Sequence, residues 1–162
     1  MRLGGYDYSQ EGMFFVTICT LGRELLLVPD YASEMVEKYW RKLSEKFPGT
    51  EIGEYVIMPN HIHGILLIVG ADPCVGPYYT NEKLPRMVQW FKTFTTNAYI
   101  KGIKDSGWQP FDGKLWQRGY HEKIIRTETE LRALSEYIRA NPDKWDEDTE
   151  NPMMTERHNG QR

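Results

Sequence analysis

Two strand-like runs joined by a short turn constrain the fold of this 162-residue chain most strongly. Residues 51–57 and 61–69 are rich in β-branched and aromatic side chains, and a proline-containing turn signal occupies residues 58–60. These runs predict an antiparallel hairpin. The second run is apolar at nearly every position from Ile62 to Val69, which is typical of a strand buried on both faces. We therefore expect this strand to lie centrally in a sheet.

Periodic patterns on either side of the hairpin predict further elements. A β-branched and aromatic run over residues 13–20 is typical of a core strand. Apolar residues at helical spacing predict one helix that Asp30 caps and that ends before Pro48. The same spacing predicts another helix across residues 84–103. A short strand is expected over residues 120–125. Strands and helices therefore alternate along most of the chain.

A third helix is expected near the carboxyl end. Residues 127–130, Thr-Glu-Thr-Glu, fit a capping box, and Asn141 should end the helix because Pro142 follows it. The order strand, helix, hairpin, helix, short strand, helix suits an α+β domain whose antiparallel sheet is covered by helices. We expect one domain over residues 1–145 and an acidic, flexible tail over residues 146–162.

The net charge of −3 conceals an uneven distribution. Residues 82–126 carry 9 basic and 4 acidic side chains, whereas the segments before and after them each have a net charge of −4. A basic middle segment can supply a phosphate-binding surface. A solvated, lysine-rich helix explains the same charge, so the distribution permits a nucleic-acid partner without establishing one.

Several classes of protein are disfavoured by composition. No apolar run approaches the roughly 20 residues that a membrane helix needs, and the first residues lack the apolar core of a secretory signal. Cys19 and Cys74 are widely separated and form no metal-binding or redox motif. We expect reduced thiols, no membrane partner and a cytoplasmic location.

His61 and His63 are candidates for binding a metal ion. Side chains alternate between the two faces of a strand, so both imidazoles should point the same way, with Ile62 on the other face. Neutral imidazole nitrogens are good ligands for divalent metals. A pair of this kind also occurs by chance, although two imidazoles within an apolar strand would be costly to bury without partners.

Tyr137 is the strongest candidate for a nucleophile. A tyrosine on an amphipathic helix is most often a core residue whose hydroxyl reaches the surface. Asn141, however, lies four residues later, which places the phenol and the amide on one face of the helix. An amide oxygen is a hard ligand that suits Mg²⁺ or Mn²⁺.

Three blocks resemble the HUH-motif single-tyrosine transposases, and most closely the REP-associated tyrosine transposases. Residues 55–67, with the sequence YVIMPNHIHGILL, resemble the HUH block, in which U is an apolar residue. Residues 116–126 resemble the second block of the family, and residues 136–142 resemble the block that carries its nucleophile. The blocks occur in the family's order and spacing, and the resemblance covers residues 13–145.

The resemblance implies a ferredoxin-like α+β fold with His61 and His63 on the central strand. It also implies metal-dependent cleavage and rejoining of single-stranded DNA, usually beside a hairpin, through a 5′-phosphotyrosine intermediate. By position, Tyr137 would be the nucleophile. His61, His63 and Asn141 would hold Mg²⁺ or Mn²⁺, and many relatives have glutamine where this chain has Asn141.

Weaker candidates surround this set. Tyr120 is a competing tyrosine outside the nucleophile block, and the neighbouring His121 and Glu122 are candidate supporting residues that could equally face solvent. Single-stranded or hairpin DNA is the implied partner, and both a monomer and a homodimer remain open. Six basic side chains are expected to contact DNA, namely Arg86, Lys92, Lys101, Lys104, Arg118 and Arg126.

Two other functions remain open. One is a non-catalytic DNA-binding or regulatory domain with the same fold. The other is a metal hydrolase that uses a metal-bound water, and its activity would survive the substitution Tyr137→Phe. Because the family includes single-copy chromosomal members, strand cleavage is better founded than transposition as a biological role.

Overall fold

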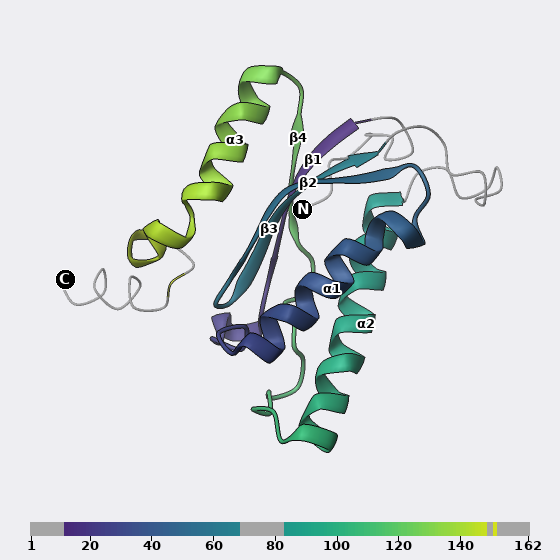
Figure 1. Cartoon of the computed structure of the whole chain (residues 1–162), viewed down its shortest axis with the longest axis vertical. Coiled ribbons are helices and arrows are strands. Elements are labelled where there is room, and N and C mark those ends of the chain that lie inside the picture. Colours follow the sequence, from purple (N-terminus) through teal and green to yellow (C-terminus); the bar gives the residue numbers. More distant parts are fainter. Residues whose placement is uncertain (1–11, 69–82, 149–150, 152–162) are drawn as a thin grey trace.

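A four-stranded antiparallel sheet forms the centre of the protein (Figure 1). The computed structural model describes residues 12–68, 83–148 and 151. The strands are β1 (Gly12–Cys19), β2 (Thr50–Met58), β3 (His61–Ile68) and β4 (His121–Ile125), and they lie in the order β2-β3-β1-β4. This order and the alternation of strands and helices are ferredoxin-like. The predicted α+β class and the predicted hairpin are confirmed.

In the part of the chain that the structure describes, three α-helices cover the two faces of the sheet. Helices α1 (Asp30–Lys46) and α2 (Lys83–Ser106) lie together on one side, and α3 (Glu128–Ala140) lies on the other (Figure 1). Two short 3₁₀ helices, η1 (Leu21–Arg23) and η2 (Pro142–Glu147), follow β1 and α3. The larger core forms between the sheet and the α1/α2 pair, and a smaller cluster lies under α3.

The alternation of side chains along β3 determines where its histidines lie. Ile62 is fully buried in the core beneath α1 and α2. His61 and His63 point to the opposite face, where Ile65 belongs to the cluster under α3. β3 pairs with β1 on one side and β2 on the other, so the predicted central position of the histidine strand is confirmed.

Gly64 permits a close contact between β3 and α1. A Cβ atom at this position would lie 2.2 Å from Cζ2 of Trp40, which is far below any van der Waals distance. The Trp40 side chain is almost fully buried and packs edge-on against Phe91 of α2. The glycine beside the histidines is therefore required by packing of the large core.

The start of α1 and the segment after α3 differ in part from the expectations. Asp30 lies within the first turn of α1 and Pro29 is its N-cap, without a side-chain capping bond. α3 ends at Asn141 as predicted, with Asn141 as its C-cap. Asn141 nevertheless keeps a right-handed helical conformation before Pro142, and the chain continues directly into η2. Residues 146 and 147, the first of the expected flexible tail, lie in η2, and the Asp148 amide donates to the Trp145 carbonyl. Most of the expected tail lies outside the described residues, so its flexibility stays a prediction.

The cap of α3 and the position of Cys19 can also be compared with the sequence. The capping box of α3 forms as predicted, with the Thr127 hydroxyl accepting from the Glu130 amide and the Glu130 carboxylate accepting from the Arg126 amide. Cys19 is buried on β1. Glycine and proline residues predict a loop over residues 70–79, which lies outside the described residues. Within the described ranges, no helix is both long and apolar enough to cross a membrane.

Candidate metal and nucleophile site

His61 and His63 form a close, buried pair under α3. Their Nε2 atoms lie 3.0 Å apart, and the ring centroids are separated by 4.4 Å. His61 is fully buried and His63 is 5% exposed. At this distance, the lone pairs of the two Nε2 atoms can be directed at one common position, where a single ion could bind.

A buried polar residue holds the outer nitrogen of each histidine. Asn60 Oδ1 lies 2.8 Å from His61 Nδ1, while the Asn60 amide nitrogen donates to the Arg23 carbonyl. An amide oxygen only accepts, so the proton of neutral His61 is on Nδ1 and its Nε2 carries a lone pair. Thr17 Oγ1 lies 2.7 Å from His63 Nδ1.

The Thr17 hydroxyl suits either tautomer of His63. With a hydrogen bond between the two Nε2 atoms, His63 carries its proton on Nε2, and Thr17 donates to Nδ1. A metal ion bound by both Nε2 atoms would require that proton on Nδ1, with Thr17 as acceptor. A hydroxyl can do both by rotation, so Thr17 allows His63 to become a ligand without losing its hydrogen bond.

Burial keeps both imidazoles neutral. It lowers the pKa of His61 from 6.5 to about 4. The pKa of His63 falls to about 3, chiefly through burial and further through the neighbouring His61, while Asp148 opposes the shift. Both rings are therefore uncharged at neutral pH, which is the form that binds metals.

Asp148 lies in the same cluster. Its Oδ2 atom is 3.7 Å from His61 Nε2, and its side chain is only 7% exposed. Potential ligand atoms of His61, His63 and Asp148 all lie within 4.8 Å of one another. η2 brings Asp148 to this position, and Trp145 of η2 packs 6.1 Å from the His61 ring. No motif in the sequence pointed to Asp148, because it lies in an acidic segment without periodicity.

Tyr137 lies over the histidines from α3. Its ring centroid is 5.5 Å from that of His63 and 6.2 Å from that of Phe15. Phe15 of β1 stacks on His63, so the three rings form one cluster. Tyr137 is 47% exposed, so its phenol is accessible to a large substrate while its ring contacts the buried pair.

Asn141 follows Tyr137 by one helical turn and is buried. Its side-chain oxygen is shielded from solvent and accepts no hydrogen bond from any residue that the structure describes. A buried amide oxygen without a partner is unfavourable by about 1–3 kcal/mol. A cation would satisfy it, and this agrees with the predicted role of Asn141 as a metal ligand, which stays a prediction.

His121 lies on the same face of the sheet as the histidine cluster, whereas Tyr120 and Glu122 lie on the other face. His121 of β4 pairs with Thr17, and Thr17 pairs with His63, so the three residues form one row across the sheet. Two strand spacings place the His121 backbone about 10 Å from that of His63. Tyr120 packs against the core on the other face, where its hydroxyl donates to Glu122.

The six basic residues predicted to contact DNA are distributed over two regions. Arg86, Lys101 and Lys104 are exposed on α2, and Lys101 forms an ion pair with Asp105. Arg118 and Arg126 are exposed before β4 and before α3. Lys92 donates to the backbone carbonyls of Gln117 and Gly119, so two of its three hydrogens hold this segment. None of these residues belongs to the histidine cluster.

The residues around the histidine pair fit a divalent metal ion. Two neutral imidazole nitrogens converge and a carboxylate lies beside them. One turn after Tyr137, the buried Asn141 oxygen lacks a partner among the described residues. Mixed nitrogen and oxygen donors suit Mn²⁺, and oxygen-rich sites with few protein ligands suit Mg²⁺. The cluster is therefore a candidate metal centre, and its geometry does not indicate which ion it would take.

The comparison with known families agrees with this geometry. Residues 12–141 match the family described as "Transposase IS200 like". The chain belongs to the IS200-like transposase family. The matched range begins with β1 and ends at Asn141, so it includes the histidine pair and Tyr137. The family predicted from the three sequence blocks is therefore confirmed.

Relatives of this IS200-like transposase include two proteins of Haemophilus influenzae. One, an uncharacterized protein, is 33% identical over 91% of this chain and 89% of its own length. The other is provisionally named a REP-associated tyrosine transposase and is 25% identical over 85% of this chain and 74% of its own length.

Two solved structures share the fold. A REP-associated tyrosine transposase bound to a REP hairpin superposes with a TM-score of 0.58 at 23% identity, covering 88% of this chain and 74% of the other. A transposase-like protein from Deinococcus radiodurans superposes with a TM-score of 0.50 at 21% identity, covering 86% of this chain and 96% of the other. These likenesses establish the α+β fold of the family.

Proposed function

We propose that this IS200-like transposase cleaves and rejoins single-stranded DNA through a covalent link to Tyr137. The observation that carries the proposal is the position of the Tyr137 ring, 5.5 Å from the His63 ring in a cluster that fits a metal ion. A tyrosine in the core would be shielded, whereas Tyr137 is 47% exposed. Exposure beside a buried donor set is what a nucleophile for a large substrate needs.

The chemistry would balance as a transesterification. The Tyr137 phenol loses its proton to solvent, and its oxygen forms a bond to the scissile phosphorus. The bond between phosphorus and the 3′-oxygen breaks, and that oxygen takes up a proton. The products are a 5′-phosphotyrosine and a free 3′-hydroxyl. Because the number of phosphoester bonds is unchanged, a 3′-hydroxyl can later reverse the step without a nucleotide cofactor.

The other residues of the cluster would hold the metal ion. His61 and His63 would provide Nε2 atoms, while Asn141 and Asp148 would provide oxygens. When bound, a divalent ion supplies Lewis-acid stabilisation of the charge that develops on the phosphate. Thr17 and Asn60 would orient the two imidazoles through their outer nitrogens.

The substrate we propose is DNA beside a hairpin, as the name of one solved relative suggests for that protein. The test is to incubate the protein with labelled single strands that contain hairpins from the surrounding genome, with Mn²⁺ or Mg²⁺. A covalent protein–DNA adduct should form and should be lost in Tyr137→Phe, while binding of the same DNA is retained. Peptide mapping should place the adduct on Tyr137.

Three outcomes would contradict this mechanism. An adduct on Tyr120 would move the nucleophile to the other face of the sheet. Cleavage that survives Tyr137→Phe without any adduct would indicate hydrolysis by a metal-bound water. Absence of adduct with every hairpin, together with tight binding, would favour a non-catalytic DNA-binding domain.

A further inference from the structure

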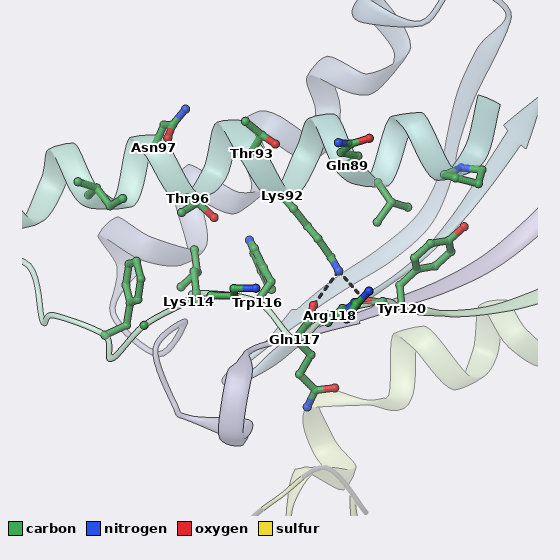
Figure 2. Close-up of a pocket in the computed structure, with 17 residues that line it drawn as sticks. Gln89, Lys92, Thr93, Thr96, Asn97, Lys114, Trp116, Gln117, Arg118 and Tyr120 are labelled. Atoms are coloured by element: carbon green, nitrogen blue, oxygen red, sulfur yellow. Dashed lines mark hydrogen bonds between the residues drawn. The ribbon is translucent and has the colours of Figure 1, made fainter. Parts of the chain in front are cut away.

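A groove separate from the histidine cluster runs between α2 and residues 111–120 (Figure 2). Its volume is about 770 Å³, and we call it the α2 groove. None of its lining residues belongs to the cluster of His61, His63, Tyr137, Asn141 and Asp148. Tyr120 and Arg118 lie at the end of the groove where the chain enters β4.

The charge of the α2 groove is opposite to that of the whole chain. Lys92, Lys114 and Arg118 line it, and no carboxylate is present among the described residues that do so. The chain as a whole has a net charge of −3. Lys114 and Arg118 are exposed and therefore available to a ligand, whereas Lys92 is used to hold the groove wall. The groove is thus suited to an anionic ligand.

The remaining lining combines amides, hydroxyls and aromatic rings. Gln89, Thr93 and Asn97 are spaced four apart along α2 and form one row of hydrogen-bonding groups (Figure 2). Phe111 and Tyr120 are only partly buried and lie on the opposite wall. Amide side chains read the edges of nucleobases, and aromatic rings stack on the faces of unpaired bases. A simple phosphate would leave these rings and amides unused.

The wall that carries the cations is held rigidly. The Lys92 ammonium donates to the carbonyls of Gln117 and Gly119, and Figure 2 shows this side chain reaching across from α2. The Trp116 indole nitrogen donates to Thr95 at 2.8 Å. Burial lowers the pKa of Lys92, which agrees with a role within the wall. The groove is therefore formed in advance of any ligand.

The α2 groove ends next to the free edge of the sheet. β4 is the last strand in the order β2-β3-β1-β4, and Tyr120 immediately precedes it. The next residue, His121, points to the other face, in the row that continues through Thr17 to His63. A flexible chain leaving the groove at Tyr120 needs only to pass around β4 to reach the histidine cluster.

We propose that the α2 groove binds single-stranded DNA that is continuous with the strand cleaved at Tyr137. The groove holds backbone phosphates through Lys114 and Arg118 and unpaired bases through the amide row and the two rings. This inference rests on the proposed function for the identity of the nucleic acid. Binding in the groove itself requires neither the metal ion nor the nucleophile.

The test is fluorescence anisotropy with a labelled single strand of about 16 nucleotides, the upper range for one binding groove. Tyr137→Phe protein in EDTA is used, so that neither cleavage nor metal binding contributes. The double variant Lys114→Gln/Arg118→Gln should bind at least about tenfold more weakly and with a smaller salt dependence. Lys38→Gln/Lys42→Gln on α1 removes the same charge outside the groove and should change affinity less than twofold.

Crosslinking provides a second readout. A strand that carries 5-iodouracil should crosslink to Phe111 or Tyr120 under ultraviolet light, and crosslinking should fall in Asn97→Asp, which adds a negative charge to the amide row. Equal weakening by both lysine-containing double variants, crosslinks that map only outside the groove, or equal binding of a duplex would each overturn the proposal. If groove binding holds but no adduct forms at Tyr137, the proposed catalysis fails and the groove stands.

Discussion

Asp148 Oδ2 lies 3.7 Å from Nε2 of His61, although the two residues belong to segments far apart in the sequence. η2 makes this contact by continuing from α3 past Pro142 and returning toward β3. The carboxylate brings a negative charge to a pair of neutral imidazoles. A divalent cation gains more from this arrangement than from two histidines alone.

Asp148→Asn is expected to weaken Mn²⁺ binding about tenfold, in the range found when a polar partner of a metal site is lost. The substitution keeps the size of the side chain and removes its charge. Isothermal titration calorimetry with the folded protein measures the change. Asp146→Asn is the matched control, because Asp146 is exposed on the same short helix. Equal affinities for the two variants would remove Asp148 from the metal site.

Thr17→Val is expected to reduce metal affinity by about 10- to 100-fold, because the Nδ1 proton of a metal-bound His63 would have no acceptor. Thr17→Ser keeps the hydroxyl and should restore most of the affinity. The ¹⁵N chemical shifts of the imidazole distinguish the two tautomers, so a spectrum with and without Mg²⁺ tests the mechanism directly. A His63 tautomer that is the same in both spectra would contradict it.

Acid is expected to destabilise the protein through the histidine pair. The folded-state pKa values of about 4 and about 3 lie below the ordinary value of 6.5, so the unfolded chain binds protons that the folded protein excludes. Stability is therefore complete above pH 6.5 and falls as the pH decreases toward 4 and then 3. For His61 alone the loss amounts to about 3 kcal/mol.

Urea denaturation in EDTA at several pH values measures this loss. The variant His61→Gln/His63→Gln should show a flatter dependence between pH 6.5 and pH 4. If the free energy of unfolding of this variant changes with pH as steeply as that of the unaltered protein, other groups cause the acid sensitivity.

Gly64→Ala is expected to destabilise the fold by about 1–3 kcal/mol, because its Cβ would lie 2.2 Å from the Trp40 ring. Thermal unfolding measures the change. In the background of Trp40→Leu the added methyl group meets a smaller side chain, so the penalty of Gly64→Ala should shrink. An undiminished penalty would mean that the ring contact is not its cause.

The sequence predicted the parts of the site that are set by local geometry. Alternation along a strand placed His61 and His63 on one face, and helical periodicity placed Asn141 one turn after Tyr137. Both relations depend only on neighbours in the chain, so a single sequence contains them. The hairpin, and with it the central position of β3, followed from hydrophobic pattern for the same reason.

Residues that meet through long-range pairing were not predicted. Thr17 reaches His63 because β1 and β3 pair in one particular register, and that register depends on the packing of two helices against the sheet. Phe15 stacks on His63 through the same pairing. The sequence offered no sign of either contact, since a threonine or phenylalanine within an apolar strand is ordinary.

The histidine pair and Tyr137 were thus determined as candidates by the sequence alone, through periodicity and the order of three blocks. The tertiary structure decided what surrounds them. It gave the histidines their hydrogen-bond partners, brought Asp148 to them from an acidic segment, and separated the α2 groove from the metal cluster by the thickness of the sheet. These features arise from contacts between distant segments, whose free energy depends on the whole packed core and not on any local pattern.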